Sequence, residues 1–193
     1  RNEGFKSSSQ VNYVARCGNF REKGYEYTGA LRILKVMLSY DYLWINIRVK
    51  GGAYGCMSGF GRSGEGYLVS YRDPNLRETN AVYEGVTDYL RNFQADERDM
   101  TKFVIGTISD LDTPLTPSIR GSRGLSAYLS GVTQEMMQKE RDQVLSATVE
   151  DIRALADIVQ AILDTGAFCV VGNEDRIEGA KDLFKETKNL YQA

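Results

Sequence analysis

The chain has 193 residues, and its 24 lysines and arginines nearly balance its 26 aspartates and glutamates, giving a formal net charge of -2. Such a balance argues against a nucleic-acid-binding footprint or a polybasic membrane anchor, so we expect neither nucleic acid nor membrane as a partner. The sequence contains no histidine, which excludes a Ser-His nucleophile and a histidine-ligated metal site within this chain.

The first half of the chain predicts a strand, a long helix and a hairpin. Residues 11–16 have the composition of a short strand. Residues 54–60 and 66–72 predict two strands joined by a glycine-rich turn at 61–64. Between these segments, apolar residues at the three- and four-residue spacing of one helical face predict an amphipathic helix leading into Arg48: Leu31, Leu34, Leu38, Tyr42 and Ile45.

The second half predicts several helices and one more strand. Pro114 and Pro117 end one of these helices, and Thr148 with Asp151 forms a capping-box pattern at the start of another. Strands at the start, a run of helices and a returning strand and helix together predict an α+β fold with helices layered on one face of a sheet. We also expect residues upstream of Arg1 to complete the sheet or its neighbour. The segments are helices near 82–93, 100–111, 125–132, 135–145, 149–162 and 177–184, and a buried strand at 167–171.

Size and apolar patterning predict one soluble, cytoplasmic domain over residues 1–193. The longest apolar run, Ala167 to Val171, is far shorter than the ~20 residues of a membrane span. The N-terminus does not have the pattern of a signal peptide. Cys17, Cys56 and Cys169 are too dispersed to indicate a disulfide framework or a metal site, and we interpret them as buried or incidental thiols.

One glycine-rich segment imitates a dinucleotide-binding fingerprint. Residues 59–64 match G-x-G-x-x-G, and Glu84 lies 20 residues beyond Gly64. That fingerprint requires a helix whose N-terminus faces the pyrophosphate, whereas the residues that follow, 67–71, are strand-like. We therefore interpret the segment as a hairpin turn.

Two further groups of charged residues are candidate sites. Asp110 and Asp112 could form a catalytic carboxylate pair, but acids near a helix end are more often solvated. Arg120 and Arg123 could hold an anion, although ion pairs at the surface or solvated charges are the favoured interpretation.

The segment from Arg48 to Gly55 is the most informative one. Along a regular strand, Arg48 and Tyr54 would lie roughly 20 Å apart, too far to share a substrate group. Gly51 and Gly52 allow the chain to bend, because glycine adopts positive φ without steric cost. From spacing alone, the favoured interpretation is that Arg48 forms a structural salt bridge and Tyr54 is a half-buried tyrosine. The alternative is that the two side chains together bind a polarised carbonyl group.

Five groups of residues make the chain resemble the pitrilysin- or insulinase-type (inverzincin) zinc metallopeptidases, most closely the last domain of the presequence-protease branch. They occur in the order seen in that domain and extend over nearly the whole chain: Asn2–Phe5, Val11–Val14, Arg48–Gly55, Tyr71–Asn75, and Asp112–Pro114 with Pro117.

The resemblance implies a mixed, largely antiparallel sheet and a place in a larger enzyme. The family's zinc site requires two histidines and a glutamate from an H-x-x-E-H motif in the first domain, so the zinc would belong to the parent enzyme and none would be bound by this chain. The chain would then be the C-terminal, non-zinc domain of a metalloendopeptidase that degrades peptides in an enclosed chamber. Its partners would be the metal-bearing N-terminal half and the peptide substrate.

The resemblance also implies roles for particular residues. Arg48 and Tyr54 would be catalytic, donating hydrogen bonds to the carbonyl oxygen as it gains negative charge, and both would bind substrate together with Gly52. The alternative hypothesis is a non-catalytic domain of the same family that serves in assembly or in peptide binding, which the absence of histidine would also permit.

Overall fold

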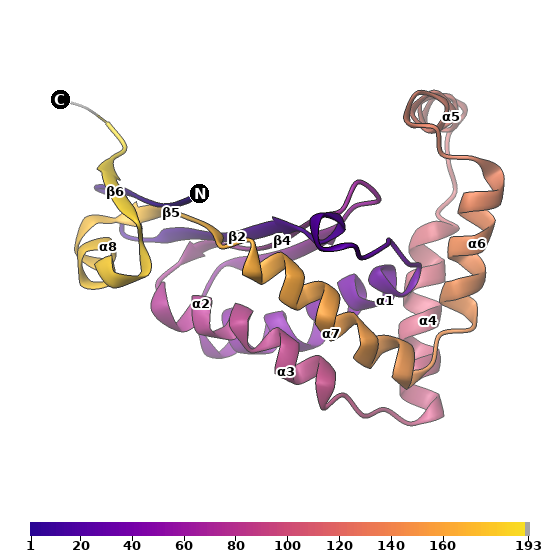
Figure 1. Cartoon of the computed structure of the whole chain (residues 1–193), viewed down its shortest axis with the longest axis horizontal. Helices are drawn as coiled ribbons and strands as arrows, with labels where there is room; N and C mark the ends of the chain where they lie inside the picture. Colours follow the sequence, from indigo (N-terminus) through magenta and orange to yellow (C-terminus); the bar gives the residue numbers. More distant parts are fainter. Residues whose placement is uncertain (192–193) are drawn as a thin grey trace.

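The computed structural model describes residues 1–191, and its centre is a six-stranded sheet in the order β3-β4-β2-β5-β1-β6 (Figure 1). β1 runs parallel to its neighbours β5 and β6, while the other three pairings are antiparallel. This confirms a mixed, largely antiparallel sheet. The strands are β1 (Asn2–Ser7), β2 (Asn12–Asn19), β3 (Gly55–Phe60), β4 (Glu65–Asp73), β5 (Ala167–Asn173) and β6 (Glu186–Asn189).

The helices cover one face of this sheet. Val14, Leu68 and Val170 point into the core and are at most 2% exposed, whereas Tyr13 and Tyr67, on the opposite face, are 47% and 40% exposed. Figure 1 shows the helical layer on a single side, which confirms the predicted α+β arrangement. The α-helices are α1 (Ala30–Met37), α2 (Arg77–Glu84), α3 (Val86–Arg91), α4 (Glu97–Leu111), α5 (Pro117–Ser130), α6 (Gln134–Leu145), α7 (Val149–Asp164) and α8 (Glu174–Gly179).

Helix α7 is the central helix of the core layer. Its capping box forms as predicted, with Thr148 accepting from the backbone of Asp151 and the Asp151 carboxylate accepting from the backbone of Thr148. The helix then passes very close to β2 at Gly18, where a Cβ atom would overlap the carbonyl oxygen of Ile162 and the side chain of Thr165. Only glycine allows this close approach of helix and strand.

The helix expected to lead into Arg48 is present but changes its geometry. After α1 the chain continues in two π-helical segments, Leu38–Tyr42 and Trp44–Lys50. The wider turn shifts the angular position of every residue after Met37, so the 3.6-residue spacing does not hold to the end of the helix.

Two helices predicted as continuous are shorter in the structure. The segment near 82–93 breaks at Gly85 into α2 and α3, where a Cβ atom would meet the Tyr42 hydroxyl at 2.5 Å. The final helix, expected over 177–184, ends at Gly179 and is followed by a 3-10 turn (Lys181–Leu183) and β6. Strands β1 and β6 were not predicted, and they add two strands to the sheet beside β5. That residues upstream of Arg1 complete the sheet or its neighbour stays a prediction.

Helix α5 is set apart from the rest of the molecule (Figure 1). None of the residues from Pro117 to Ser130 is buried, and Leu125, Tyr128 and Leu129 are 60–83% exposed. Thr116 caps its N-terminus, Pro117 occupies the first turn and Gly131 ends it at φ 67°. The helix is therefore defined by its ends more than by packing. Across residues 1–191, no helix is both long and apolar enough to cross a membrane.

The close approach at Gly18 predicts a large effect of a single methyl group. Gly18→Ala should lower the free energy of unfolding by about 1–3 kcal/mol, because neither the α7 backbone nor β2 can move away without breaking its pairing. Gly121→Ala in α5 is the matched control. Its Cβ meets no atom within 4 Å, so it should stabilise the helix by about 0.5–1 kcal/mol. Urea unfolding of both variants measures the difference, and an equal effect at the two sites would contradict it.

Candidate functional site

The chain reverses direction between Arg48 and Tyr54 at two glycines. Arg48 lies in the last turn of the segment Trp44–Lys50, a helix and not the strand considered from spacing alone. Gly51 caps this helix, and Gly52 has φ 79°, in the left-handed region that favours glycine. The Gly52 N–H donates to the Arg48 carbonyl at 3.0 Å. The glycine-mediated bend is therefore present, and it leads directly from a helix end into β3.

This bend brings Arg48 and Tyr54 into contact. The Arg48 Nε donates to the Tyr54 carbonyl at 3.1 Å, and the guanidinium carbon lies 4.3 Å from the centre of the Trp44 ring. Arg48 forms no ion pair with any described residue, so the structural salt bridge is not what the structure shows. Both side chains are exposed, Tyr54 by 62%, at the start of β3 on the edge of the sheet. Trp44 was not predicted to belong to this group.

A second arginine and a second tyrosine pack beside the pair. The Arg72 guanidinium lies 5.4 Å from the centre of the Tyr54 ring, and the rings of Tyr54 and Tyr71 are 5.7 Å apart. Arg72 is the non-glycine residue with positive φ, 47°, among the residues described, and it lies where the β2–β4 register shifts. A side-chain-bearing residue held in this region is typical of constrained surroundings. Sequence reasoning noted residues 71–75 without assigning them a role, because neither the bulge nor the sign of φ can be seen in a sequence.

A buried carboxylate holds the turn after β4. Asp73 is fully buried, and its two carboxylate oxygens accept from the Asn75 N–H at 2.9 Å and the Thr79 hydroxyl at 2.7 Å. The Asn12 side chain donates to the Asp73 carbonyl at 3.0 Å. The Asn75 side chain then donates to the Gly51 carbonyl at 2.6 Å. This series of bonds connects β2, β4 and α2 to the helix end that carries Arg48.

The pair supplies hydrogen-bond donors and lacks the other groups that hydrolysis requires. A guanidinium and a phenol can both donate to a carbonyl or carboxylate oxygen. Among residues 1–191, no three His, Cys, Asp or Glu side chains are grouped as metal ligands, so the residues present do not fit a zinc ion. Burial raises the pKa of the nearby Cys56 thiol to about 11, which keeps it protonated near neutral pH. The site can bind and orient an oxygen but does not itself contain a nucleophile.

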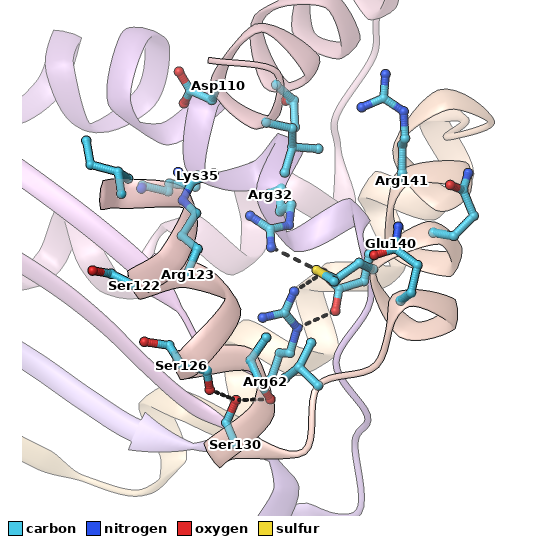
Figure 2. Close-up of a pocket in the computed structure, with 18 of the residues that line it drawn as sticks. Arg32, Lys35, Arg62, Asp110, Ser122, Arg123, Ser126, Ser130, Glu140 and Arg141 are labelled. Atoms are coloured by element: carbon cyan, nitrogen blue, oxygen red, sulfur yellow. Dashed lines mark hydrogen bonds and ion pairs between the residues drawn. The ribbon is translucent and has the colours of Figure 1, made fainter. Parts of the chain in front are cut away.

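The other candidates from the sequence have structural roles or lie elsewhere. Asp112 forms a two-point ion pair with Arg141, at 2.6 and 2.8 Å, which holds the pKa of the Asp112 carboxyl below its usual value. Asp112 is thus engaged structurally. Arg120 is exposed, and Arg123 faces a separate cavity (Figure 2).

The glycine-rich segment is a hairpin turn, as interpreted from the sequence. The Gly64 N–H donates to the Gly61 carbonyl at 3.0 Å, and strand β4 follows at once. No helix begins at this loop, so the geometry of a dinucleotide fingerprint is not formed.

Comparison with known proteins gives one family. The model of the PreP C-terminal domain matches residues 2–174. Protein HypA of Clostridium perfringens is 46% identical over 192 residues, all of this chain and 20% of that protein. Presequence protease 1, chloroplastic/mitochondrial, of Arabidopsis thaliana is 36% identical over 193 residues, all of this chain and 18% of that protein. The chain therefore spans about a fifth of the length of these relatives.

The fold also matches solved structures of low sequence identity. The peptidase M16 inactive domain from Pseudomonas fluorescens superposes with a TM-score of 0.62 at 18% identity, covering 89% of this chain and 42% of that one. At this identity the match shows the fold alone.

Loss of the Asp73 carboxylate should destabilise the protein much more than loss of an exposed carboxylate. Asp73→Ala should lower the free energy of unfolding by about 2–4 kcal/mol, because it leaves the buried Thr79 hydroxyl and the Asn75 N–H without their acceptor. Asp182→Ala is the control. It removes an exposed partner of Arg77 and should cost less than about 1 kcal/mol. Thermal and urea unfolding measure both, and a similar small loss for the two variants would contradict the role given to Asp73.

Proposed function

The chain belongs to the family of PreP C-terminal domains, and from that membership we propose that it is the C-terminal, non-zinc domain of a larger zinc metalloendopeptidase that degrades peptides in an enclosed chamber. The proposal is supported by presequence proteases among the relatives and by the contact between Arg48 and Tyr54. The chain's share of those relatives, about a fifth, leaves room for a metal-bearing N-terminal half as its partner.

In this proposal Arg48 and Tyr54 act on the substrate carbonyl. The hydrogen bond from the Arg48 Nε to the Tyr54 carbonyl fixes the orientation of the guanidinium. Its remaining N–H groups can donate to the peptide backbone of the substrate. The Tyr54 hydroxyl donates to the carbonyl oxygen as negative charge develops there. Gly52 allows the peptide to approach, because it has no side chain at the turn.

The remaining chemistry comes from the parent protein. When bound in the metal-bearing half, zinc supplies activation of water and polarisation of the scissile carbonyl. Residues of this chain bind and orient the peptide from the opposite side. A single domain over residues 1–193 and a cytoplasmic location for the parent stay predictions.

A second candidate function is a non-catalytic domain for assembly or peptide binding. It is favoured by the shared fold with an inactive peptidase domain and by the exposed apolar residues of α5. An assembly domain, however, has no need of an exposed Arg–Tyr pair held at a glycine bend. The two functions differ in whether changes at the pair affect turnover.

The proposal predicts that the 193-residue chain alone hydrolyses no peptide and binds no stoichiometric zinc, because it supplies donors but no complete set of ligands. Metal analysis after dialysis against zinc and cleavage of a fluorogenic peptide test both points. Chelator-sensitive cleavage by the purified chain would overturn the assignment of the metal to another part of the parent.

In the parent enzyme, Tyr54→Phe should lower kcat by about 10²- to 10³-fold, the usual cost of one oxyanion donor, with ring packing on Tyr71 and Arg72 retained. Arg48→Lys keeps the positive charge but loses the planar, two-pronged set of N–H donors, so it should raise KM and lower kcat together. Steady-state kinetics on one peptide measure both variants.

Tyr40→Phe is the matched control, since Tyr40 is 72% exposed and lies outside the pair. It should leave kcat and KM unchanged. Zinc content and melting temperature should be the same in every variant. Near-normal turnover by both Tyr54→Phe and Arg48→Lys would favour the non-catalytic function.

A further inference from the structure

A second site lies at the other end of the β3–β4 hairpin. Helices α1, α4, α5 and α6 and the hairpin turn line a cavity of about 860 Å³ that is partly open to solvent (Figure 2), and its volume is that of a small-molecule pocket. The length of β3, six residues, separates it from Tyr54 by roughly 20 Å. It is therefore distinct from the Arg48–Tyr54 pair, and nothing in the proposed peptidase function uses it.

The cavity is lined by more cations than anions. Its two carboxylates are Asp110 and Glu140. Five cationic side chains from four parts of the fold face the same space, and Figure 2 shows them arranged around it: Arg32 and Lys35 on α1, Arg62 in the hairpin turn, Arg123 on α5 and Arg141 on α6.

Part of this charge is already balanced inside the protein. The Glu140 side chain is 9% exposed and accepts from Arg62 through two nitrogens and from the Arg32 Nη2 at 3.2 Å. Arg141 is paired with Asp112. Subtracting Asp110, Glu140 and Asp112 from the five cations leaves a formal charge of +2 at the cavity.

Several donors remain without a partner. The Arg32 Nε is buried and has no hydrogen-bond acceptor among the residues described. Within residues 1–191, neither Lys35 nor Arg123 forms an ion pair, although they line facing walls of the cavity. Lys35 and Arg123 are exposed, so water solvates their charges and the fold brings no acidic residue to them. Lys35 and Arg123 are therefore the donors available to a ligand, whereas the buried Arg32 Nε is not reached from the cavity.

We propose that this cavity binds an organic phosphate monoester. A phosphate group carries -1.5 to -2 charges near neutral pH and three acceptor oxygens, which matches the remaining charge of the cavity and offers acceptors to both Lys35 and Arg123. A single carboxylate would neutralise only half of that charge. Arg123 can hold phosphate oxygens in forked geometry, and Lys35 adds a point charge. The hydroxyls of Ser122 and Ser126 line the same wall of α5.

The apolar part of the lining indicates an ester and not the inorganic ion. Val36, Ile119 and Met137 face the same cavity as the cations. An inorganic phosphate would leave these side chains against water, whereas an aromatic or aliphatic body would cover them. The free ester is favoured over a phosphorylated peptide, because the volume of the cavity suits a small molecule.

Isothermal titration calorimetry of the 193-residue chain with phenyl phosphate tests the proposal. We expect saturable one-to-one binding that weakens at high salt and is roughly tenfold tighter than that of inorganic phosphate. Arg123→Gln and Lys35→Gln should each weaken binding by roughly tenfold or more, the usual loss of one charge-assisted contact.

The controls are Arg120→Gln, three residues from Arg123 on the same helix but outside the cavity, and Lys23→Gln, another exposed lysine. Both should bind as the unchanged chain does. Circular dichroism checks that each variant keeps its helical content. If α5 unfolds in Arg123→Gln, the phosphate affinity of Lys35→Gln still tests the site, because Lys35 lies on α1. Absence of saturable binding, or equal losses in the controls, would overturn the site. Tighter binding of a phosphoserine tripeptide than of phenyl phosphate would show that the ligand is a phosphorylated peptide and not a free phosphate ester.

Discussion

Buried Asp73 is the interaction on which the placement of the Arg48–Tyr54 pair depends. Its carboxylate holds the turn between β4 and α2, and the Asn75 side chain carries that constraint to the carbonyl of Gly51. A buried carboxylate is costly unless every lone pair facing the protein is used, so the turn has one low-energy arrangement. The helix end, the glycine bend and the start of β3 are positioned as one unit for this reason.

The open face of the sheet carries exposed side chains next to the Arg48–Tyr54 pair. Tyr13, Met57 and Tyr67 lie on that face and are 40–51% exposed, and Tyr54 lies beside them at the sheet edge. Exposed apolar side chains on neighbouring strands of one face are typical of a surface that contacts another protein. It suits a wall that faces the other half of the proposed parent, where a peptide bound between the halves would meet Arg48 and Tyr54.

Periodicity predicted those parts of the fold that local interactions determine. Helix α7 shows both its apolar face and its capping box in the sequence, and the β3–β4 hairpin shows its glycine turn. Strands β1 and β6 depend on pairing between the two ends of the described chain, which no local pattern reveals. The same limit applies at the site: Gly51 and Gly52 predicted the bend, whereas the contacts of Trp44 and Arg72 arise only in the folded chain.

The glycine-rich hairpin turn shows how far a motif depends on its surroundings. In a dinucleotide fold its glycines would open a helix, but here the turn leads into β4, and its glycines serve to reverse the chain. The turn instead carries Arg62, which reaches Glu140 on α6 and joins that helix to the sheet. The Glu140 carboxylate also accepts from the Arg32 Nη2, so two arginines share one acidic partner at the cavity. The excess of positive charge at the cavity thus comes from side chains that the fold brings together from several elements, and not from the glycine spacing.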